Sequence, residues 1–138
     1  MSGSLSGKVA VVAGATRGAG RGIAQMLGEA GATVYCTGRS TRRSLSPIGR
    51  PEPIDETAEL VSAAGGRGIA VRTDHSKEEE VAALFEQVRK DSGQLDVLVN
   101  DIGGEDQAEW QPIWKADLNQ GFAFFDTAVR THIITSRY

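Results

Sequence analysis

Apolar and polar positions along the chain divide it into short apolar runs and longer segments with helical spacing. The apolar runs cover residues 8–13, 32–37, 68–73 and 95–99, and most of them lie beside glycine. Valine and other β-branched residues are frequent in them, as is typical of buried strands of a parallel sheet. The pattern therefore predicts four strands.

Between these runs, apolar residues recur with the spacing of amphipathic helices. The predicted helices cover residues 19–30, 54–64, a segment from about Ser76 to Gly93, and a last one reaching Tyr138. In the first helix the residues at i, i+3, i+4 and i+7 predict the core-facing side; they are Ile23, Met26, Leu27 and Ala30. In the third, Ser76 and Glu79 predict a capping box, and the glycine after each of these two helices predicts its end.

The order β-α-β-α-β-α-β-α predicts an α/β doubly wound parallel sheet, the Rossmann fold, with strand order 3-2-1-4. Residues 1–138 then form a single dinucleotide-binding domain. The last helix reaches Tyr138 without a stop signal, and the fourth strand would be an open parallel edge. We therefore expect the fold to be truncated before a fifth strand.

Composition narrows the class of protein. A net charge of −3 and a pI of about 5.4 argue against nucleic-acid binding. No apolar run approaches the roughly 20 residues of a membrane helix, and no signal peptide is evident, so we expect a cytoplasmic protein. The single cysteine, Cys36, excludes an internal disulfide, and its alternation with Tyr35 predicts a core position. Two histidines, His75 and His132, give no metal site.

A glycine-rich loop lies between the first strand and the first helix. Glycine there allows a sharp turn and a close approach of the backbone to a diphosphate. The N-terminus of the following helix adds unpaired N–H groups and a positive dipole end. The loop thus favours nucleotide binding over a tight turn without a ligand; its candidate cofactor-binding residues are Gly14, Thr16, Arg17, Gly18, Ala19 and Gly20.

The loop spacing G-x-x-x-G-x-G resembles that of the short-chain dehydrogenase/reductase family, which has T-G-x-x-x-G-x-G after its first strand. Ala13 replaces the threonine here. The residues 5–12, L-S-G-K-V-A-V-V, are similar to the start of many members, L-x-G-K-V-A-x-V, and the later strands also match. The resemblance implies the NAD(P)-binding half of an oxidoreductase that interconverts alcohols and carbonyls by hydride transfer.

The end of the second strand indicates which nicotinamide cofactor fits. An acidic residue there would bind the ribose 2′-hydroxyl of NAD, but the sequence has Gly38 followed by Arg39. The resemblance implies that Arg17 is a second basic residue of NADP-binding members. Two guanidinium groups can bind a 2′-phosphate, which predicts NADP rather than NAD. The alternative for Arg39 is a solvated loop cation.

Further cofactor contacts are implied by the resemblance. Asp74 would hydrogen-bond the adenine, with the backbone of His75 beside it; a strand-end turn and helix cap is the other interpretation of Asp74. The family's N-N-A-G motif corresponds to residues 100–103, where Asp101 and Ile102 depart from it. Asn100 would brace the strand ends, and the backbone of Ile102 and Gly103 would lie near the nicotinamide-side ribose.

The resemblance provides no catalytic residue in this chain. The family uses a serine after its fifth strand and a Tyr-x-x-x-Lys motif, whereas Tyr138 is the last residue here. Asn119 and Ala128 are the two candidates for the family's helical asparagine, and neither is assigned. The implied substrate is a small carbonyl or alcohol and the full-length form a homo-oligomer. The rival functions are an NADP-sensing module without turnover and, less well supported, a methyltransferase-type domain.

Two other features leave alternatives open. The segment 40–53 contains three prolines and three arginines and is either a cover over the adenosine end of the cofactor or a surface loop. Trp110 and Trp114 either line a substrate entrance or pack on a helix.

Overall fold

The sheet of the protein is parallel and four-stranded, in a computed structural model that describes residues 3–44, 51–103 and 109–138. Its strands are β1 (Val9–Ala13), β2 (Thr33–Gly38), β3 (Arg67–Arg72) and β4 (Val97–Asn100), in the order β3-β2-β1-β4. In the register of the sheet, Val11 of β1 pairs with Tyr35 of β2 and with Leu98 of β4. The fold class and the strand order predicted from the sequence are confirmed.

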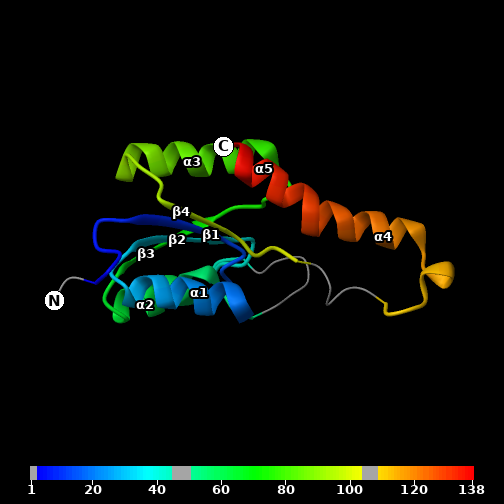
Figure 1. The fold of residues 1–138 in the computed structure, drawn as a ribbon, viewed down its shortest axis with the longest axis horizontal. Coiled ribbons are helices and arrows are strands. Elements are labelled where there is room, and N and C mark those ends of the chain that lie inside the picture. Colours follow the sequence, from blue (N-terminus) through cyan, green and yellow to red (C-terminus); the bar gives the residue numbers. More distant parts are fainter. Residues whose placement is uncertain (1–2, 45–50, 104–108) are drawn as a thin grey trace.

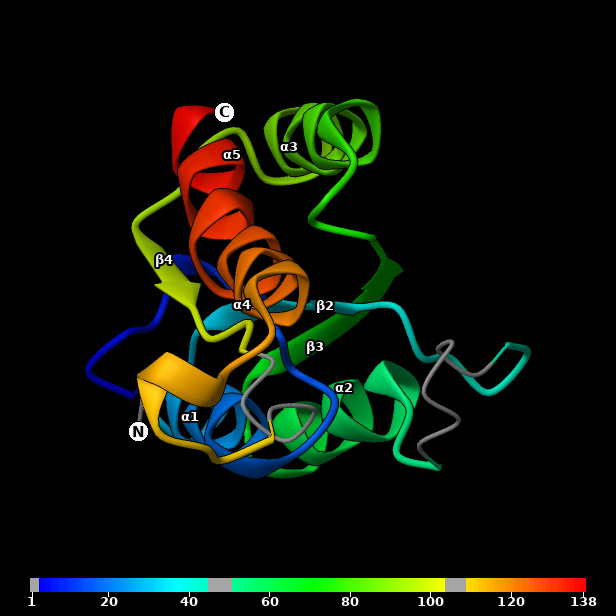
Figure 2. The same ribbon diagram turned by 90° about the vertical axis from the view of Figure 1, so that its right-hand side faces the viewer.

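Helices cover both faces of this sheet. One face carries α1 (Gly18–Glu29) and α2 (Ile54–Ala63), and the other carries α3 (Glu78–Ser92) and α5 (Thr131–Arg137) (Figure 1). The predicted last helix consists of α4 (Leu118–Phe125), a π-helical segment η3 (Asp126–Arg130) and α5, after a short 3₁₀ turn η2 (Ile113–Lys115). Its α4 part extends beyond the sheet, whereas α5 lies beside α3 (Figures 1 and 2).

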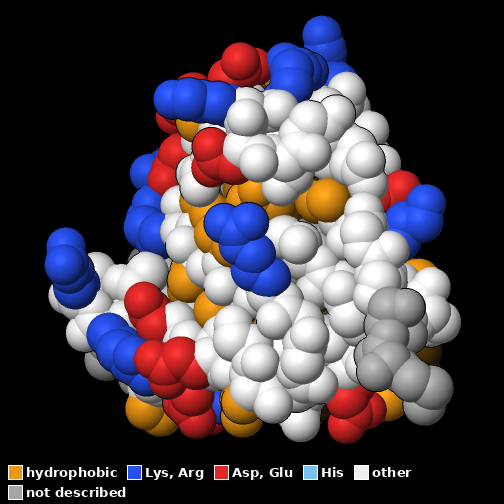
Figure 3. All heavy atoms as spheres, turned by 90° about the vertical axis from the view of Figure 1, so that its left-hand side faces the viewer, with side chains coloured by type: hydrophobic (Ala, Val, Ile, Leu, Met, Phe, Trp, Pro, Cys, Tyr) orange, Lys and Arg blue, Asp and Glu red, His pale blue; other side chains and the backbone are white. Residues whose placement is uncertain are grey.

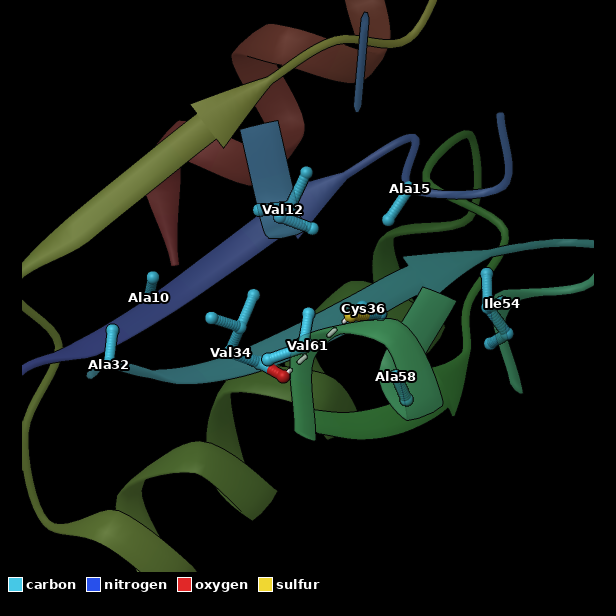
Figure 4. Packing of buried hydrophobic residues seen from close by; sticks show 10 residues of the cluster. Ala10, Val12, Ala15, Ala32, Val34, Cys36, Ile54, Ala58 and Val61 are labelled. Atoms are coloured by element: carbon cyan, nitrogen blue, oxygen red, sulfur yellow. Dashed lines mark hydrogen bonds between the residues drawn. The ribbon is translucent and has the colours of Figure 1, made fainter. Parts of the chain in front are cut away.

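Alternating side chains of the central strands divide the core in two. Val12, Val34 and Cys36 point toward α1 and α2, where they meet Ile54 and Val61 (Figure 4). On the other face, the buried residues come from β1, β2 and α3 and are Val9, Val11, Tyr35, Val81, Leu84, Phe85 and Val88. The buried position predicted for Cys36 is confirmed, and burial raises the pKa of its thiol to about 12.

The predicted inner face of α1 is wrong at two of its four residues, whereas Leu27 packs against the core as predicted. Ile23 and Met26 are exposed, and the buried residues of the helix are Gly20, Ala24 and Gly28. The reason is the close approach of α1 to α2. A Cβ atom added at Gly28 would lie 2.8 Å from Cγ1 of Val61, so only a residue without a side chain fits there.

The predicted capping box of α3 is also wrong. The N-cap residue is Lys77, and no side chain caps the helix. The hydroxyl of Ser76 instead donates a hydrogen bond to Asp74 Oδ1 at 2.6 Å, so it is not available to the first turn of the helix. Three glutamates at the start of the helix, residues 78–80, compensate in part because they face its positive dipole end. Gly93 ends α3 in the left-handed conformation, as predicted.

Candidate cofactor-binding site

A cleft of about 660 Å³ lies at the carboxyl ends of the strands, the end of the molecule that faces the viewer in Figure 2. Open parallel sheets bind ligands at this end, in the crevice where the strand order reverses. Eleven of the twelve residues predicted to bind the cofactor line the cleft: Gly14, Thr16, Arg17, Gly18, Ala19, Arg39, Asp74, His75, Asn100, Ile102 and Gly103.

The opposite end of the molecule, where the strands begin, is shown in Figure 3. Charged side chains of both signs are interspersed over this face. No helix in the described ranges is long and apolar enough to cross a membrane. Across the same ranges, no group of three or more metal-ligating side chains is found.

The glycine loop forms the floor of the cleft. Gly14 and Gly18 both have positive φ angles, +90° and +56°, which L-residues with a side chain adopt at a cost. A Cβ at Gly14 would approach the carbonyl oxygen of Asp101 to 2.5 Å, whereas a Cβ at Gly18 would meet no protein atom within 4 Å. The loop therefore packs tightly against β4 at its start and presents an open surface at Gly18.

Gly20 is the one predicted binding residue that does not line the cleft. It is buried, and a Cβ atom there would collide with the carbonyl oxygen of Gly14. The role of this glycine in the structure is to let α1 start directly beneath the loop, so the prediction that Gly20 contacts a ligand is not supported by its position.

At the end of β2, Gly38 and Arg39 both line the cleft. A Cβ at Gly38 would lie 3.0 Å from Cγ2 of Thr16 and 3.2 Å from Cγ2 of Ile54. Position 38 therefore leaves little room for the acidic side chain that binds a ribose 2′-hydroxyl in NAD-binding domains. The positive charge of Arg39 takes the place of that acid at the cleft wall.

Asp74 follows β3 and closes a turn with Ser76. Its Oδ1 accepts hydrogen bonds from the backbone N–H and the hydroxyl of Ser76, at 3.0 and 2.6 Å. Burial acts to raise the pKa of Asp74, but these hydrogen bonds and the charge of Arg39 outweigh it and hold the pKa below its ordinary value. The turn interpretation is confirmed, the helix-cap part is not, and the adenine contact stays a prediction.

His75 lies with its side chain inside the protein. Its Nε2 is 2.7 Å from the hydroxyl oxygen of Thr37 in β2, and its Nδ1 is 2.8 Å from that of Thr135 in α5. Burial lowers its pKa to about 4, so the imidazole is neutral at pH 7. Because the imidazole is engaged by Thr37 and Thr135, only the backbone of His75 is available to a ligand in the cleft. The resemblance to the family implies the same role for this residue.

The end of β4 is fixed to the last helix. Asn100 donates a hydrogen bond from Nδ2 to the hydroxyl of Ser136 at 3.0 Å, while its buried Oδ1 has no partner among the described residues. His132 donates from Nε2 to the carbonyl oxygen of Ile102 at 2.9 Å. Asn100 thus connects β4 to α5, rather than bracing strand ends alone.

One wall of the cleft is provided by the last helix and was not predicted from the sequence, apart from Ala128, which was a candidate for the position of the family's helical asparagine. Its residues there are Thr127, Ala128, Thr131 and His132. The π-helical segment contains two of them, and such segments occur frequently at functional sites. A π-helical turn has no clear signature in a single sequence, and His132 is one of several polar residues in this helix, so no local pattern singled it out.

Trp110 and Trp114 are highly exposed, at 87% and 81%, and neither lines the cleft. Neither a substrate entrance nor helix packing is therefore found for them in the described structure.

Of the segment 40–53, residues 45–50 lie outside the described residues. Arg42 forms an ion pair with Glu59 of α2, and the carbonyl oxygen of Ser40 accepts a hydrogen bond from the N–H of Ile54 at 2.9 Å, so the described residues 40–44 are attached to α2.

Comparison with known proteins decides the family. The sequence profile described as short chain dehydrogenase matches residues 8–137. The chain belongs to the short-chain dehydrogenase family. It is therefore a member of an oxidoreductase family, as the glycine spacing implied, and its Rossmann architecture is that of its solved relatives.

Among these relatives, Dehydrogenase/reductase SDR family member 1 of Mus musculus is 48% identical over 97 residues, which are 70% of this chain and 28% of the mouse protein. The crystal structure of a short-chain dehydrogenase from Mycobacterium thermoresistibile superimposes with a TM-score of 0.83 at 25% identity, over 97% of this chain and 46% of that one. An NADH-dependent reductase complexed with NAD superimposes with a TM-score of 0.76 at 25% identity, over 99% of this chain and 52% of that one. The chain thus spans about half the length of these solved dehydrogenases.

Proposed function

We propose that the cleft binds NADP, and that the chain provides the cofactor-binding half of an NADP-dependent dehydrogenase or reductase. One observation carries the proposal: the glycine loop and Arg39 line the same cleft at the carboxyl ends of the strands. A diphosphate and a 2′-phosphate on one adenosine need these two kinds of group close together.

The residues present fit the shape and charge of such a cofactor. The open backbone at Gly18 gives a diphosphate access to the start of α1, because no side chain stands in the way. Arg17 and Arg39 would bind the 2′-phosphate, and Asp74 with the backbone of His75 would meet the adenine. Asn100, Ile102 and Gly103 would lie along the nicotinamide-side ribose.

The bound nicotinamide would supply or accept a hydride, and this chain's residues would hold it in place. We propose no catalytic residue among the 138, since no tyrosine in the sequence is followed four residues later by lysine. General acid–base help is typically worth about 10²–10⁴ in rate. The chain alone is therefore expected to bind NADP without turning over carbonyls or alcohols.

The second candidate is an NADP-binding module that does no chemistry. The two candidates differ in whether a longer protein containing this chain oxidises NADPH in the presence of ketones or quinones. Turnover by the 138-residue chain itself would contradict both.

We further propose a small carbonyl or alcohol as substrate, a cytoplasmic location and a homo-oligomer in the full-length form. Support for an oligomer comes from the apolar side chains exposed on the last helix. They belong to α4, which extends beyond the sheet (Figure 1), and to its continuation, and include Leu118, Phe122, Phe125 and Ile133. Apolar surfaces of this kind mark interaction sites on soluble proteins.

The cofactor proposal is tested by titrating the chain with NADP and with NAD and repeating both titrations with Arg39→Asp. A charge-assisted hydrogen bond is worth about 1.5–3 kcal/mol, so the substitution is expected to weaken NADP binding about tenfold to a hundredfold. NAD binding should change little or improve, because the aspartate can accept a bond from the 2′-hydroxyl.

Arg43→Asp is the matched control. Arg43 lies four residues after Arg39 but does not line the cleft, so this variant should keep the wild-type preference for NADP over NAD. Equal affinity of the wild-type chain for the two cofactors, or equal losses in the two variants, would show that Arg39 does not read the 2′-phosphate.

A further inference from the structure

Two carbonyl groups in the middle of the glycine loop are held from below by side chains that do not line the cleft. The hydroxyl of Thr57, in α2, donates a hydrogen bond to the carbonyl oxygen of Ala15 at 2.6 Å. The Nε of Arg21, in α1, donates to the carbonyl oxygen of Thr16 at 2.9 Å. Neither interaction is required to form α1 or α2, because both donors are side chains.

These two contacts belong to one connected group of side chains. Arg21 Nε also lies 3.1 Å from the hydroxyl oxygen of Thr57, which joins the two side chains. The guanidinium reaches the carbonyl oxygen of Pro53 at 3.4 Å and forms an ion pair with Glu56 at 3.2 Å. Thr57 is fully buried and the Arg21 side chain is 20% exposed, so both are fixed in place by their surroundings.

The geometry of the peptide bond turns this anchoring into an effect on the cleft. In a trans peptide the N–H of one residue points opposite to the C=O of the residue before it. When Thr57 fixes the carbonyl of Ala15, it directs the N–H of Thr16 away from α2. In the same way, Arg21 fixes the carbonyl of Thr16 and so directs the N–H of Arg17 away from the Arg21 side chain. Thr16 and Arg17 both line the cleft.

We propose that Arg21 and Thr57 are positioning residues that aim the Thr16 and Arg17 amides at the diphosphate of the cofactor. The inference rests on the proposed function, because it takes the glycine loop to be the diphosphate site. Amides held in advance lose no orientational freedom when an anion binds, which raises affinity without a direct contact. The charge of Arg21 is largely matched by Glu56, so its effect is one of orientation.

The adenosine end of the cleft has separate supports. Arg39 follows β2, and Asp74 is held by Ser76. A loss of the anchoring group should therefore mainly weaken ligands that carry the diphosphate. A ligand that carries only the 2′-phosphate keeps Arg39, and the long Arg17 side chain, unlike the Arg17 backbone amide, can still reach it when the peptide turns. A general loss of structure would weaken both.

The experiment uses two probes, NADP and adenosine 2′-monophosphate, which has no diphosphate. Each is titrated into the wild-type chain and into Arg21→Ala, Thr57→Val and Thr57→Ser. Thr57→Val keeps the size and changes no charge, so an altered affinity there comes from the lost hydroxyl. Thr57→Ser keeps the hydroxyl. Arg89→Ala, which removes an exposed arginine paired with Glu86 on α3, is the matched control for Arg21.

We expect Arg21→Ala and Thr57→Val to weaken NADP about tenfold, as lost hydrogen bonds of ordinary strength would. Both should leave adenosine 2′-monophosphate within about twofold of the wild type. Thr57→Ser and Arg89→Ala should match the wild type with both probes. If Arg21→Ala fails to fold by circular dichroism, Arg21→Lys replaces it and should keep part of the wild-type NADP affinity, because its ammonium group can reach the Thr16 carbonyl.

Three outcomes overturn the inference. Equal losses for the two probes would mean that the group merely stabilises the fold. Unchanged NADP affinity in a folded Thr57→Val would mean that the amides need no anchoring. If the wild-type chain binds neither probe, the proposed function itself fails and the inference fails with it, which separates that case from the other two.

Discussion

The hydroxyl oxygen of Thr37 lies 2.7 Å from Nε2 of His75 and thereby fixes the tautomer of a buried imidazole. The single hydroxyl proton of Thr37 is donated to the carbonyl oxygen of Val12 at 3.1 Å. Thr37 can then only accept from His75, so Nε2 carries the proton. Nδ1 in turn accepts from the hydroxyl of Thr135, at 2.8 Å.

This chain of hydrogen bonds connects three elements of the fold. Thr37 belongs to β2, His75 follows β3, and Thr135 belongs to α5. In the neutral imidazole each ring nitrogen has a partner of the matching kind. A second ring proton, on Nδ1, would have to be donated to the Thr135 hydroxyl, whose own proton would then have to turn to another acceptor.

We therefore expect acid to destabilise the protein through His75. Burial lowers its pKa from 6.5 to about 4; the carboxylate of Asp74 opposes this and His132 adds to it. Above pH 6.5 the imidazole is neutral in both states. Between pH 6.5 and 4 the unfolded chain binds the proton and the folded chain does not, so the free energy of unfolding falls, by about 3 kcal/mol in total.

The measurement is urea unfolding of the wild type and His75→Gln at a series of pH values. Glutamine can donate to Thr37 and accept from Thr135 but does not titrate, and acid effects of the carboxylates are shared by both proteins. The stability of the wild type relative to the variant should fall steadily from pH 6.5 to 4. Parallel curves would show that His75 titrates normally.

The close contact between α1 and α2 gives a second prediction. Gly28→Ala would place a Cβ 2.8 Å from both Cγ1 and the carbonyl oxygen of Val61, and should destabilise the fold by about 1–3 kcal/mol. Gly22→Ala, in the same helix, meets nothing within 4 Å and should stabilise it by about 0.5–1 kcal/mol. Thermal unfolding of the two variants decides the matter, and a similar effect of both would contradict the packing described.

Gly18 provides a test of the phosphate loop. Gly18→Ala adds a methyl group that touches no protein atom but stands in the cleft, and should weaken NADP about tenfold to a hundredfold. Gly93→Ala, at a similar positive φ of +72°, is the control for backbone strain. Both should lose about 1 kcal/mol of stability, whereas only the first should lose affinity by calorimetry. Full NADP affinity of a folded Gly18→Ala would place the diphosphate elsewhere.

Most of the fold could be predicted from the sequence because its determinants are local. Each strand is an apolar run, and glycines with positive φ, such as Gly31 and Gly93, end the helices where expected. The inner face of α1 could not be predicted in this way. Hydrophobic periodicity assumes large apolar residues at the contact, but α1 lies so close to α2 that Gly28 and Ala24 form it.

In the candidate site, too, the features that depend on local sequence could be predicted and those that depend on distant residues could not. The glycine loop and Arg39 are short local patterns, and the structure gathers them in one cleft. The environment of His75 depends on Thr135, sixty residues later in the chain, which no local pattern reveals. The failed capping box has a similar cause, since Ser76 had a nearer partner in Asp74 than the helix it precedes.

Binding of NADP at the carboxyl ends of the four strands can be observed by backbone amide NMR of the isotope-labelled chain during a titration with NADP. We expect saturable shifts at Gly18, Arg39, Asp74 and Gly103, which line the cleft, and none at Gly65, which does not. Saturable shifts that cluster away from the cleft, or no shift at millimolar NADP in a folded chain, would contradict it.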